Sequence, residues 1–375
     1  MKRDDYFITE DLAVGYGKEP LIEHISLRVP KGSILTLIGP NGAGKSTILK
    51  TITGQLASMG GTIFLDGRPM DEMTGAEIAK KMAMVLTERL HPELLTCEEM
   101  VGTGRYPYTG KLGVLTDDDW EKVDRALRSV HAEEIAEVDF NRISDGQRQR
   151  VMLARALCQE PEILILDEPT SFLDIKHKLE ILTILKQMVR ERDLTVILSL
   201  HELDLAQKIS DTVLCINNRR IEACGPPEEI FTSEYIEELY DVTSGSYNAD
   251  FGCLEMEPAE GGPQVFVIGG CGSGISLYRK LQREGIPFAA GVLHRNDIDY
   301  EVAKDLAACV VSAEAFSEIP EDAFEEALSC MRACGKVYCT VEKFGPGNRR
   351  NQELKEIAER EGMLEPLPGE FSTVR

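Results

Sequence analysis

One short segment near the amino terminus constrains the fold more than any other part of the sequence. It reads Gly39-Pro40-Asn41-Gly42-Ala43-Gly44-Lys45-Ser46-Thr47 and matches the pattern G-x-x-x-x-G-K-[ST] at every fixed position. The apolar residues 34–38 precede it, and residues 46–53 have helical character. A strand, a glycine-rich loop and a helix in this order predict a phosphate site, because the loop amides and the helix amino terminus face the anion. Lys45 adds a positive charge, and Ser46 offers a hydroxyl to Mg²⁺.

The composition is that of a globular protein with more than one domain. The chain has 375 residues, of which 43% are hydrophobic and 28% are charged. We expect no membrane-spanning helix, because no uninterrupted apolar run is long enough. The net charge of −23 argues against nucleic acid as a partner, but it does not exclude ATP, which depends on a local loop.

The ten cysteines include no C-x-x-C pair, which favours a reduced, cytosolic chain. Cys330 and Cys334 are one helical turn apart, and with Cys339 they are candidate metal ligands. Their spacing matches no standard zinc finger, so free buried thiols are the favoured interpretation.

A second apolar segment delivers two acidic residues that complete the predicted site. Residues 163–166 are apolar throughout, which is typical of a strand buried on both faces, and Asp167 and Glu168 follow directly. Ligands of open parallel sheets bind at the carboxyl ends of strands, so we expect both carboxylates beside the phosphate loop. Asp167 is predicted to hold Mg²⁺, and Glu168 is predicted to be catalytic by orienting and polarising the attacking water.

With these motifs in place, residues 143–150 resemble the signature sequence of the ATP-binding cassette ATPases, usually Leu-Ser-Gly-Gly-Gln. Ile143 replaces the leucine and Asp145 replaces the first glycine. In that family the signature of one subunit closes on the ATP held by another. The resemblance therefore implies that four residues contact the ATP of a partner copy: Ser144, Asp145, Gly146 and Gln147. A hydroxyl, a bare glycine amide and a helix amino terminus suit an anion, although an ordinary helix cap would explain Ser144 alone.

Three further positions match the family. The segment Ser171-Phe172-Leu173-Asp174 stands where the family has its D-loop, usually Ser-Ala-Leu-Asp, and Asp174 is expected to join the contacts in trans. His201 follows the strand expected over residues 195–200 and matches the catalytic switch histidine that contacts the γ-phosphate. Tyr16 matches the aromatic residue that stacks on adenine, although a turn tyrosine packed at the sheet edge remains the alternative.

One position departs from the family. A glutamine that binds Mg²⁺ usually follows the strand that corresponds to residues 82–86, and this sequence has Thr87-Glu88 there. The threonine hydroxyl has a shorter reach than a glutamine side chain. Whether Thr87 is a metal contact therefore stays open.

Alternating strands and helices predict an α/β fold with a mostly parallel sheet, in which residues 7–14 form an edge strand. The resemblance implies a P-loop ATP-binding cassette domain over residues 1–245, with a helical subdomain at about 88–158. An acidic segment broken by glycine and proline, residues 246–263, is the expected linker. Residues 264–375 are expected to form a smaller, Rossmann-like α/β domain.

The C-terminal domain carries its own glycine-rich turn. Residues 265–274 read VFVIGGCGSG and run from a strand into a helix start, but the third glycine of the dinucleotide fingerprint is missing. A regulatory ligand site and a packing or dimerisation role both remain open. The segment His294-Arg295-Asn296-Asp297 follows the second strand, where such folds often recognise ligands.

Residues 104–110, Gly-Arg-Tyr-Pro-Tyr-Thr-Gly, resemble a segment of the ATPases that power import of iron–siderophore complexes, haem and vitamin B12. In that family the segment lies near the docking site of the permease, and two exposed tyrosines with an arginine suit an interface. A proline turn packed on its own subdomain is the alternative.

The resemblance implies an ATPase that uses ATP and Mg²⁺ and works as a homodimer in the cytoplasm, peripheral on the inner face of the cell membrane. Its expected partners are a transmembrane permease and, indirectly, an extracytoplasmic substrate-binding protein, which between them select the cargo. The alternatives are a soluble cassette ATPase without transport and a ligand sensor centred on residues 263–375.

Overall fold

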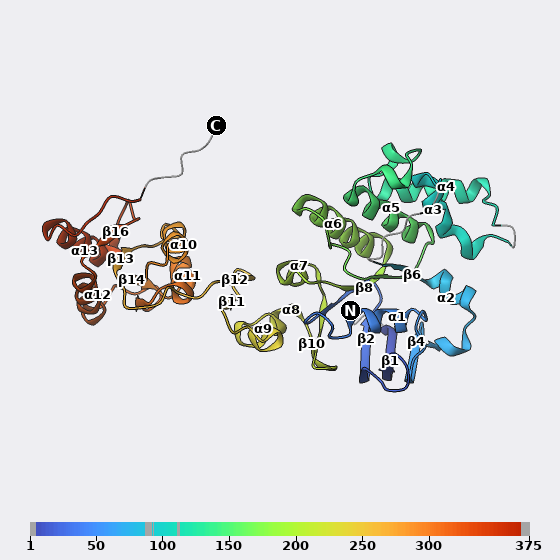
Figure 1. Cartoon of the computed structure of the whole chain (residues 1–375), viewed down its shortest axis with the longest axis horizontal. Helices are drawn as coiled ribbons and strands as arrows, with labels where there is room; N and C mark the ends of the chain where they lie inside the picture. Colours follow the sequence, from blue (N-terminus) through green and yellow to red (C-terminus); the bar gives the residue numbers. More distant parts are fainter. Residues whose placement is uncertain (1–4, 87–91, 93, 111–112, 369–375) are drawn as a thin grey trace. The chain divides into compact units, whose positions relative to one another are not determined.

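The computed structural model describes residues 5–86, 92, 94–110 and 113–368, and it divides the chain into two compact units. Unit 1 comprises residues 1–232 and unit 2 comprises residues 233–375. Figure 1 labels many of the helices and strands of each unit. Among the described helices, none combines the length and the apolar character needed to cross a membrane.

The six-stranded sheet of unit 1 has the order β10-β9-β3-β8-β7-β6. Its neighbours pair in parallel except for the antiparallel pair of β9 and β10, so the predicted mostly parallel sheet is confirmed. Strands β3, β7 and β8 are buried at every residue, as expected of strands covered on both faces. The strands are β3 (Ile34–Ile38), β6 (Met82–Val85), β7 (Ile163–Leu166), β8 (Thr195–Ser199), β9 (Thr212–Asn217) and β10 (Arg220–Gly225).

A second, antiparallel sheet of unit 1 has the order β2-β1-β4-β5. Its strands are β1 (Asp5–Val14), β2 (Ile22–Pro30), β4 (Gly60–Leu65) and β5 (Arg68–Pro69). Strand β1 pairs with β2 on one side and with β4 on the other, so the prediction of an edge strand over residues 7–14 is wrong. Alternation of apolar residues shows which face of a strand is buried, but it does not show whether both edges are paired.

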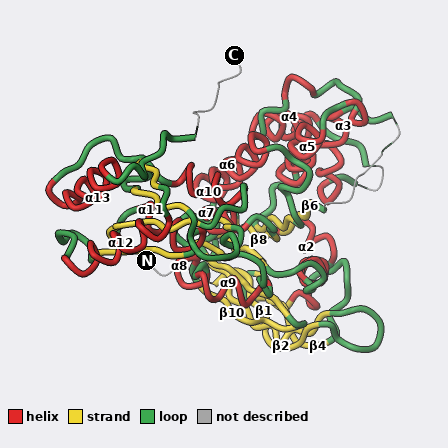
Figure 2. The backbone as a smooth tube through the Cα atoms, turned by 60° about the vertical axis from the view of Figure 1, so that its left-hand side comes forward, coloured by secondary structure: helices red, strands yellow, loops and turns green. Residues whose placement is uncertain are grey.

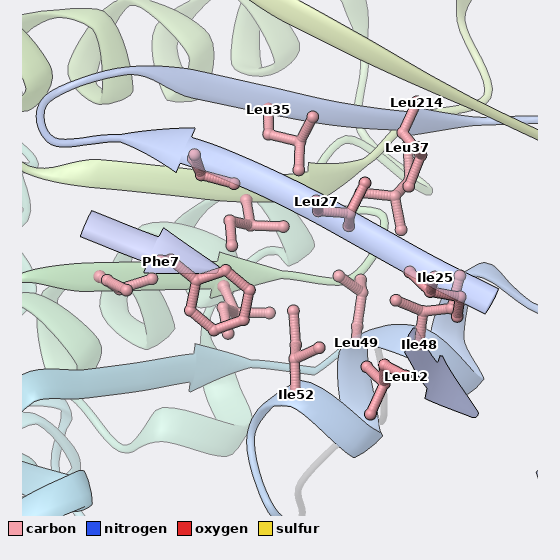
Figure 3. Close-up of a cluster of buried hydrophobic side chains, with 14 of the residues drawn as sticks. Phe7, Leu12, Ile25, Leu27, Leu35, Leu37, Ile48, Leu49, Ile52 and Leu214 are labelled. Carbon is pink, nitrogen blue, oxygen red and sulfur yellow. The ribbon is translucent and has the colours of Figure 1, made fainter. Parts of the chain in front are cut away.

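One hydrophobic core joins the two sheets to helix α1 (Lys45–Ile52). Figure 3 shows side chains from β1, β2, β3, α1 and β9 packed together. The labelled members are Phe7, Leu12, Ile25, Leu27, Leu35, Leu37, Ile48, Leu49, Ile52 and Leu214. Because α1 begins directly at the phosphate loop, the packing of α1 in this core fixes the position of the loop.

A helical part of unit 1 contains α3 (Cys97–Gly102), the 3₁₀ helix η2 (Thr103–Tyr108), α4 (Asp117–Ser129) and α5 (Asp145–Cys158). These helices contact one another, and α3, α4 and α5 lie side by side in both views (Figure 1, Figure 2). Capping boxes at Thr96, Thr116 and Ser144 start α3, α4 and α5 by satisfying backbone amides. They fall within residues 88–158, where the sequence predicted a helical subdomain. The other α-helices of unit 1 are α2 (Gly75–Lys81), α6 (Ile175–Arg192), α7 (Leu203–Ile209) and α8 (Pro227–Ile230).

Unit 2 contains a four-stranded parallel sheet with the order β15-β14-β13-β16. Its strands are β13 (Val265–Ile268), β14 (Phe288–His294), β15 (Cys309–Ala313) and β16 (Val337–Cys339). Helices α10 (Ile275–Arg283) and α11 (Ile298–Leu306) share one hydrophobic cluster with the sheet, and α12 (Glu321–Cys334) and α13 (Arg349–Arg360) share another. Alternate residues of β13 belong to the two clusters, so the unit has helices on both faces, like a Rossmann fold.

The segment expected to be a linker belongs to unit 2. Residues 246–263 contain a hairpin of β11 (Ser246–Asn248) and β12 (Cys253–Glu255), and helix α9 (Ser233–Tyr240) packs on it. The Tyr247 amide donates to Glu237 Oε1 at 2.7 Å, and Asn248 Nδ2 donates to the carbonyl of Glu301 at 3.0 Å. These bonds explain why the division falls after residue 232, earlier than the predicted domain end at residue 245.

Candidate active site

The phosphate loop needs glycine at three of its positions. Gly39 has φ 145°, and a Cβ there would lie 1.9 Å from the carbonyl oxygen of Ile216. Gly44 caps α1 with φ 110°, and a Cβ there would lie 2.7 Å from Ile22 Cδ1. Gly42 also has a left-handed backbone, with φ 78°. The close approaches leave no room for a side chain at Gly39 and Gly44, and the positive φ makes one unfavourable at Gly42.

Lys45 is held over this loop by the loop itself. Its Nζ donates to the carbonyl of Gly39 at 2.7 Å and to that of Pro40 at 3.0 Å, and the residue is only 5% exposed. Burial lowers the pKa of Lys45, whereas the nearby carboxylates of Glu168 and Asp167 raise it. The ammonium group is therefore fixed beside the loop and faces two acidic residues.

Asp167 links the loop to the end of strand β7. Its Oδ1 accepts from Ser46 Oγ at 3.1 Å and from Ser199 Oγ at 2.7 Å. Strands β3, β8 and β7 are parallel neighbours, so their carboxyl ends bring the three residues to one edge of the sheet. A hydroxyl and a carboxylate oxygen at this separation fit Mg²⁺, which prefers oxygen ligands.

Glu168 and His201 form a pair at the same edge. His201 Nε2 lies 2.5 Å from Glu168 Oε1, and Ser171 Oγ donates to Glu168 Oε2 at 3.0 Å. The Glu168 amide donates to Ser199 Oγ at 2.9 Å. Glu168 has a left-handed backbone with φ 48°, a strained conformation for a residue with a long side chain. Each carboxylate oxygen therefore has a partner, and the side chain is held in one orientation.

The structure brings together five residues that the sequence predicted: Lys45, Ser46, Asp167, Glu168 and His201. It adds Ser199, which the sequence analysis missed, and it gives Ser171 of the D-loop segment a contact with Glu168 that was not expected. Ser199 is the last residue of β8, and a polar residue ending an apolar strand was the available signal.

The signature residues lie at the start of α5. The Ser144 hydroxyl accepts from the Gln147 amide, and Gln147 Oε1 accepts from the Ser144 amide at 3.0 Å. A Cβ on Gly146 would lie 2.7 Å from the His177 ring, and Asp174 Oδ1 lies 2.8 Å from His177 Nδ1. His177, which the sequence analysis missed, thus connects the signature to the D-loop. The role of these residues in trans stays a prediction.

The two remaining predicted contacts differ in what the structure says of them. Tyr16 lies in the turn between β1 and β2, and 62% of it is exposed, so its ring is accessible for stacking. The predicted metal contact Thr87 lies outside the described residues. Both assignments stay predictions.

Arg105 does not belong to an exposed interface, so the expectation that it would is wrong. The residue is 1% exposed, and its guanidinium donates to Asp119 Oδ1 at 2.9 Å and to Glu160 Oε2 at 3.0 Å. These bonds, and a third to the Cys158 carbonyl at 2.8 Å, connect η2 to α4 and to the end of α5. The two carboxylates balance the charge of the buried guanidinium. Tyr106, in contrast, is 77% exposed. With Trp120 it lines a groove of 530 Å³ in the helical part.

The cysteines singled out by the sequence analysis are free thiols. Cys330 and Cys334 on α12 and Cys339 on β16 are half-buried against one hydrophobic cluster of unit 2. Within the described ranges, no group of three or more His, Cys, Asp or Glu residues has an arrangement that would hold a metal ion.

Comparisons with known proteins agree with this geometry. The family model described as ABC transporter matches residues 22–171, and the model of the MJ0874 family matches residues 288–364. An uncharacterized ABC transporter ATP-binding protein of Methanocaldococcus jannaschii, MJ0873, is 42% identical over 76% of this chain and 99% of its own length.

Two other relatives have named cargoes. The iron(3+)-hydroxamate import ATP-binding protein FhuC of Bacillus subtilis is 38% identical over 62% of this chain and 87% of its own. The cobalamin import ATP-binding protein BtuD of Halobacterium salinarum is 29% identical over 80% of this chain and 77% of its own.

A solved structure of a metal-chelate type ABC transporter in an inward-facing conformation aligns with a TM-score of 0.56 and 25% identity. The alignment covers 63% of this chain and 89% of that one. The predicted cassette fold is thereby confirmed. The assembled loop, acidic pair and histidine, together with a 42% identical relative matched over 99% of its length, show that the chain belongs to the ATP-binding cassette ATPases, the ATP-binding proteins of ABC transporters.

Proposed function

We propose that this chain is the ATP-hydrolysing subunit of an importer that takes up an iron–siderophore, haem or cobalamin-type metal chelate through a separate membrane permease. The observation that carries the proposal is the Glu168–His201 pair, held at the sheet edge beside Lys45. The relatives with named cargoes act on iron(3+)-hydroxamate and cobalamin, which supports the cargo class. They are import proteins, so a soluble ATPase without transport is disfavoured.

The chain's own residues divide the work on ATP. The phosphates lie against the loop amides and the amino terminus of α1, while Lys45 balances the charge of the β- and γ-phosphates. The exposed ring of Tyr16 stacks on the adenine. Ser46 and Asp167 hold Mg²⁺, which neutralises phosphate charge when it is bound.

Glu168 orients the attacking water. His201 and Ser171 each bond one oxygen of its carboxylate, so the acceptor for the water proton has a fixed direction. Positioning of this kind is the main contribution that a protein makes to phosphoryl transfer. His201 also contacts the γ-phosphate and reports its presence to the rest of the subunit.

A second copy of the chain completes the site by placing its residues 144–147 and Asp174 on the γ-phosphate. Three apolar residues of the D-loop and the start of α6 would be covered by that second copy. They are Phe172, Ile175 and Leu179, which are 80%, 78% and 52% exposed in the single chain. ATP closes the pair because these contacts exist only while the γ-phosphate is present, and hydrolysis lets the pair open.

The Glu168→Gln variant tests the proposed chemistry. We expect ATP hydrolysis to fall at least about 100-fold, the usual minimum for a lost general base, while ATP binding persists. Size-exclusion chromatography with Mg-ATP should then show a trapped dimer. Glu228→Gln changes the charge equally at an exposed residue of α8 and should hydrolyse ATP normally. Turnover near the wild-type rate in Glu168→Gln would remove Glu168 from the mechanism.

The groove lined by Tyr106 and Trp120 is our candidate docking site for the permease, at the inner face of the membrane, where the subunit lies peripherally. An exposed aromatic beside a groove suits an interface anchor. Tyr106→Ala should reduce co-purification with a membrane protein from solubilised native membranes about tenfold or more, with the isolated subunit still hydrolysing ATP. Leu254→Ala, at a residue of unit 2 that is 63% exposed, is the control. Equal co-purification of both variants would move the interface elsewhere.

A further inference from the structure

Unit 2 contains a cleft at the carboxyl ends of its strands. The winding of the sheet reverses at β13, which has β14 on one side and β16 on the other, and such reversals create ligand crevices. Loops that follow all four strands line a cleft of 760 Å³. Cys271, Asn296, Phe316 and Pro346 are lining residues from the four loops. This volume lies within the range of about 300–1,000 Å³ that is typical of small-molecule sites.

The place where a dinucleotide would put its phosphates is filled by the chain's own carboxylates. The Gly270 and Gly274 amides donate to Asp299 Oδ2 at 2.5 and 3.0 Å. The Cys271 amide donates to both oxygens of Asp297 at 2.9 Å. A phosphate would meet negative charge here instead of donors, so the loop excludes it.

The charge of the residues that line the cleft also disfavours a phosphate. Its residues include the carboxylates of Asp297 and Glu318, and no Lys or Arg occurs among the described residues that line it. Asn296 adds an exposed amide in the loop after β14. A neutral or cationic molecule with hydrogen-bond donors therefore suits the cleft, whereas an anion does not.

Phe316 provides a flat apolar surface at this cleft. It is 94% exposed and has a left-handed backbone with φ 58°, a conformation that is unfavourable for a bulky residue. His294 Nε2 lies 2.9 Å from the Ser317 carbonyl, which ties the loop that carries Phe316 to β14. Strained residues of this kind cluster at ligand sites. An exposed ring on a fixed loop is suited to stack against a planar ligand.

We propose that this cleft binds a purine nucleoside, or a similarly flat nitrogen heterocycle, that carries no phosphate group. Phe316 stacks on the ring. The Asn296 amide pairs with the ring edge, since a carboxamide matches the donor and acceptor of adenine. Glu318 accepts the sugar hydroxyls, as acidic residues do in folds of this type.

Equilibrium dialysis of the full chain with labelled adenosine tests the proposal. We expect saturable binding, and we expect Phe316→Ala to weaken it at least about fivefold, the low end of what stacking on an aromatic residue contributes. Phe316 is almost fully exposed, so its truncation should not disturb the fold. Absence of adenosine binding, or equal affinity of wild type and Phe316→Ala, would overturn the proposal.

Tyr16→Ala separates this cleft from the cassette, because it removes an exposed aromatic from the other adenine site. Adenosine affinity should be unchanged in Tyr16→Ala, and its loss there would assign the binding to the cassette and contradict the proposal. The Phe316-dependent affinity for AMP should be lower than that for adenosine. Equal or tighter AMP binding would contradict the exclusion of phosphate.

Discussion

The two glycine-rich loops of this chain follow the same local plan and have opposite surroundings. Each connects a fully buried strand, β3 or β13, to a helix, α1 or α10. The first ends in Lys45, which faces the loop, and the nearby Asp167 accepts from side-chain hydroxyls. At the second, carboxylates bond directly to the loop amides. The first environment suits a triphosphate, and the second repels one.

The glycines of the second loop serve packing. A Cβ on Gly269 would lie 2.3 Å from the Tyr278 hydroxyl, and one on Gly274 would lie 2.4 Å from Tyr278 Cζ. Tyr278 is fully buried and stacks on Phe288 with ring centroids 5.1 Å apart. A glycine-rich turn after a strand thus indicates close backbone packing in general. It indicates an anion site only where a cation accompanies it and no internal carboxylate covers its amides.

The largest effect on the difference between the two loops is expected at Lys45. Lys45→Ala removes the cation that distinguishes the first loop, and we expect ATP hydrolysis to fall about 10²- to 10³-fold, as when a preorganised charge-stabilising group is lost. Steady-state phosphate release measures the effect, and nucleotide titration should show weaker ATP binding.

Two variants control for this change. Ser273→Ala alters the second loop, where the hydroxyl bonds Thr340 Oγ1 at 2.8 Å, and it should leave hydrolysis unchanged. Lys343→Ala removes an exposed positive charge from unit 2 and should also be neutral. If Ser273→Ala impaired hydrolysis as much as Lys45→Ala, the two loops would not be functionally distinct.

The cassette site was predictable because its residues follow strand ends. Asp167, Glu168 and His201 come directly after apolar runs, and the carboxyl ends of parallel neighbours meet at one edge. A complete motif then named the chemistry of that edge. Local pattern and tertiary position therefore agree in this part of the chain.

The features that could not be predicted from the sequence depend on contacts between residues that are far apart along the chain. Arg105 has the character of a surface residue in the sequence, but the fold buries it and pairs it with Asp119 and Glu160. Asp297 lies in a segment that the sequence marked for possible ligand recognition, but the fold of unit 2 turns its carboxylate and that of Asp299 onto the glycine-rich loop. Residues 246–263 have the composition of a linker, yet two hydrogen bonds and an ion pair to α9, α11 and α10 hold their hairpin in unit 2.

A smaller effect, on stability, is expected at Asp299, whose carboxylate accepts hydrogen bonds from the amides of the second loop. Asp299→Ala leaves the Gly270 and Gly274 amides without their acceptor, which should lower the stability of unit 2 by about 1–3 kcal/mol. Asp299→Asn retains an acceptor oxygen and should cost less. Hydrogen exchange of the α10 and α11 amides in the full chain measures the loss. Equal exchange in both variants would mean that these bonds do not support the loop.

The pH dependence of the stability of unit 2, measured by hydrogen exchange at the same amides, tests the role of Asp299 further. Burial raises the pKa of Asp299, although the bonds from Gly274 and Gly270 oppose the shift, and the charge of Asp297 adds to the increase. Above the ordinary aspartate pKa of about 3.9, the folded state therefore keeps a proton that the unfolded chain has released. The stabilisation is complete below that pH and is lost as the pH rises through the folded-state pKa. We expect the opening free energy of α10 and α11 to fall over this window in wild type, and Asp299→Asn to remove that decrease. The same slope in both proteins would show that Asp299 does not titrate in this range.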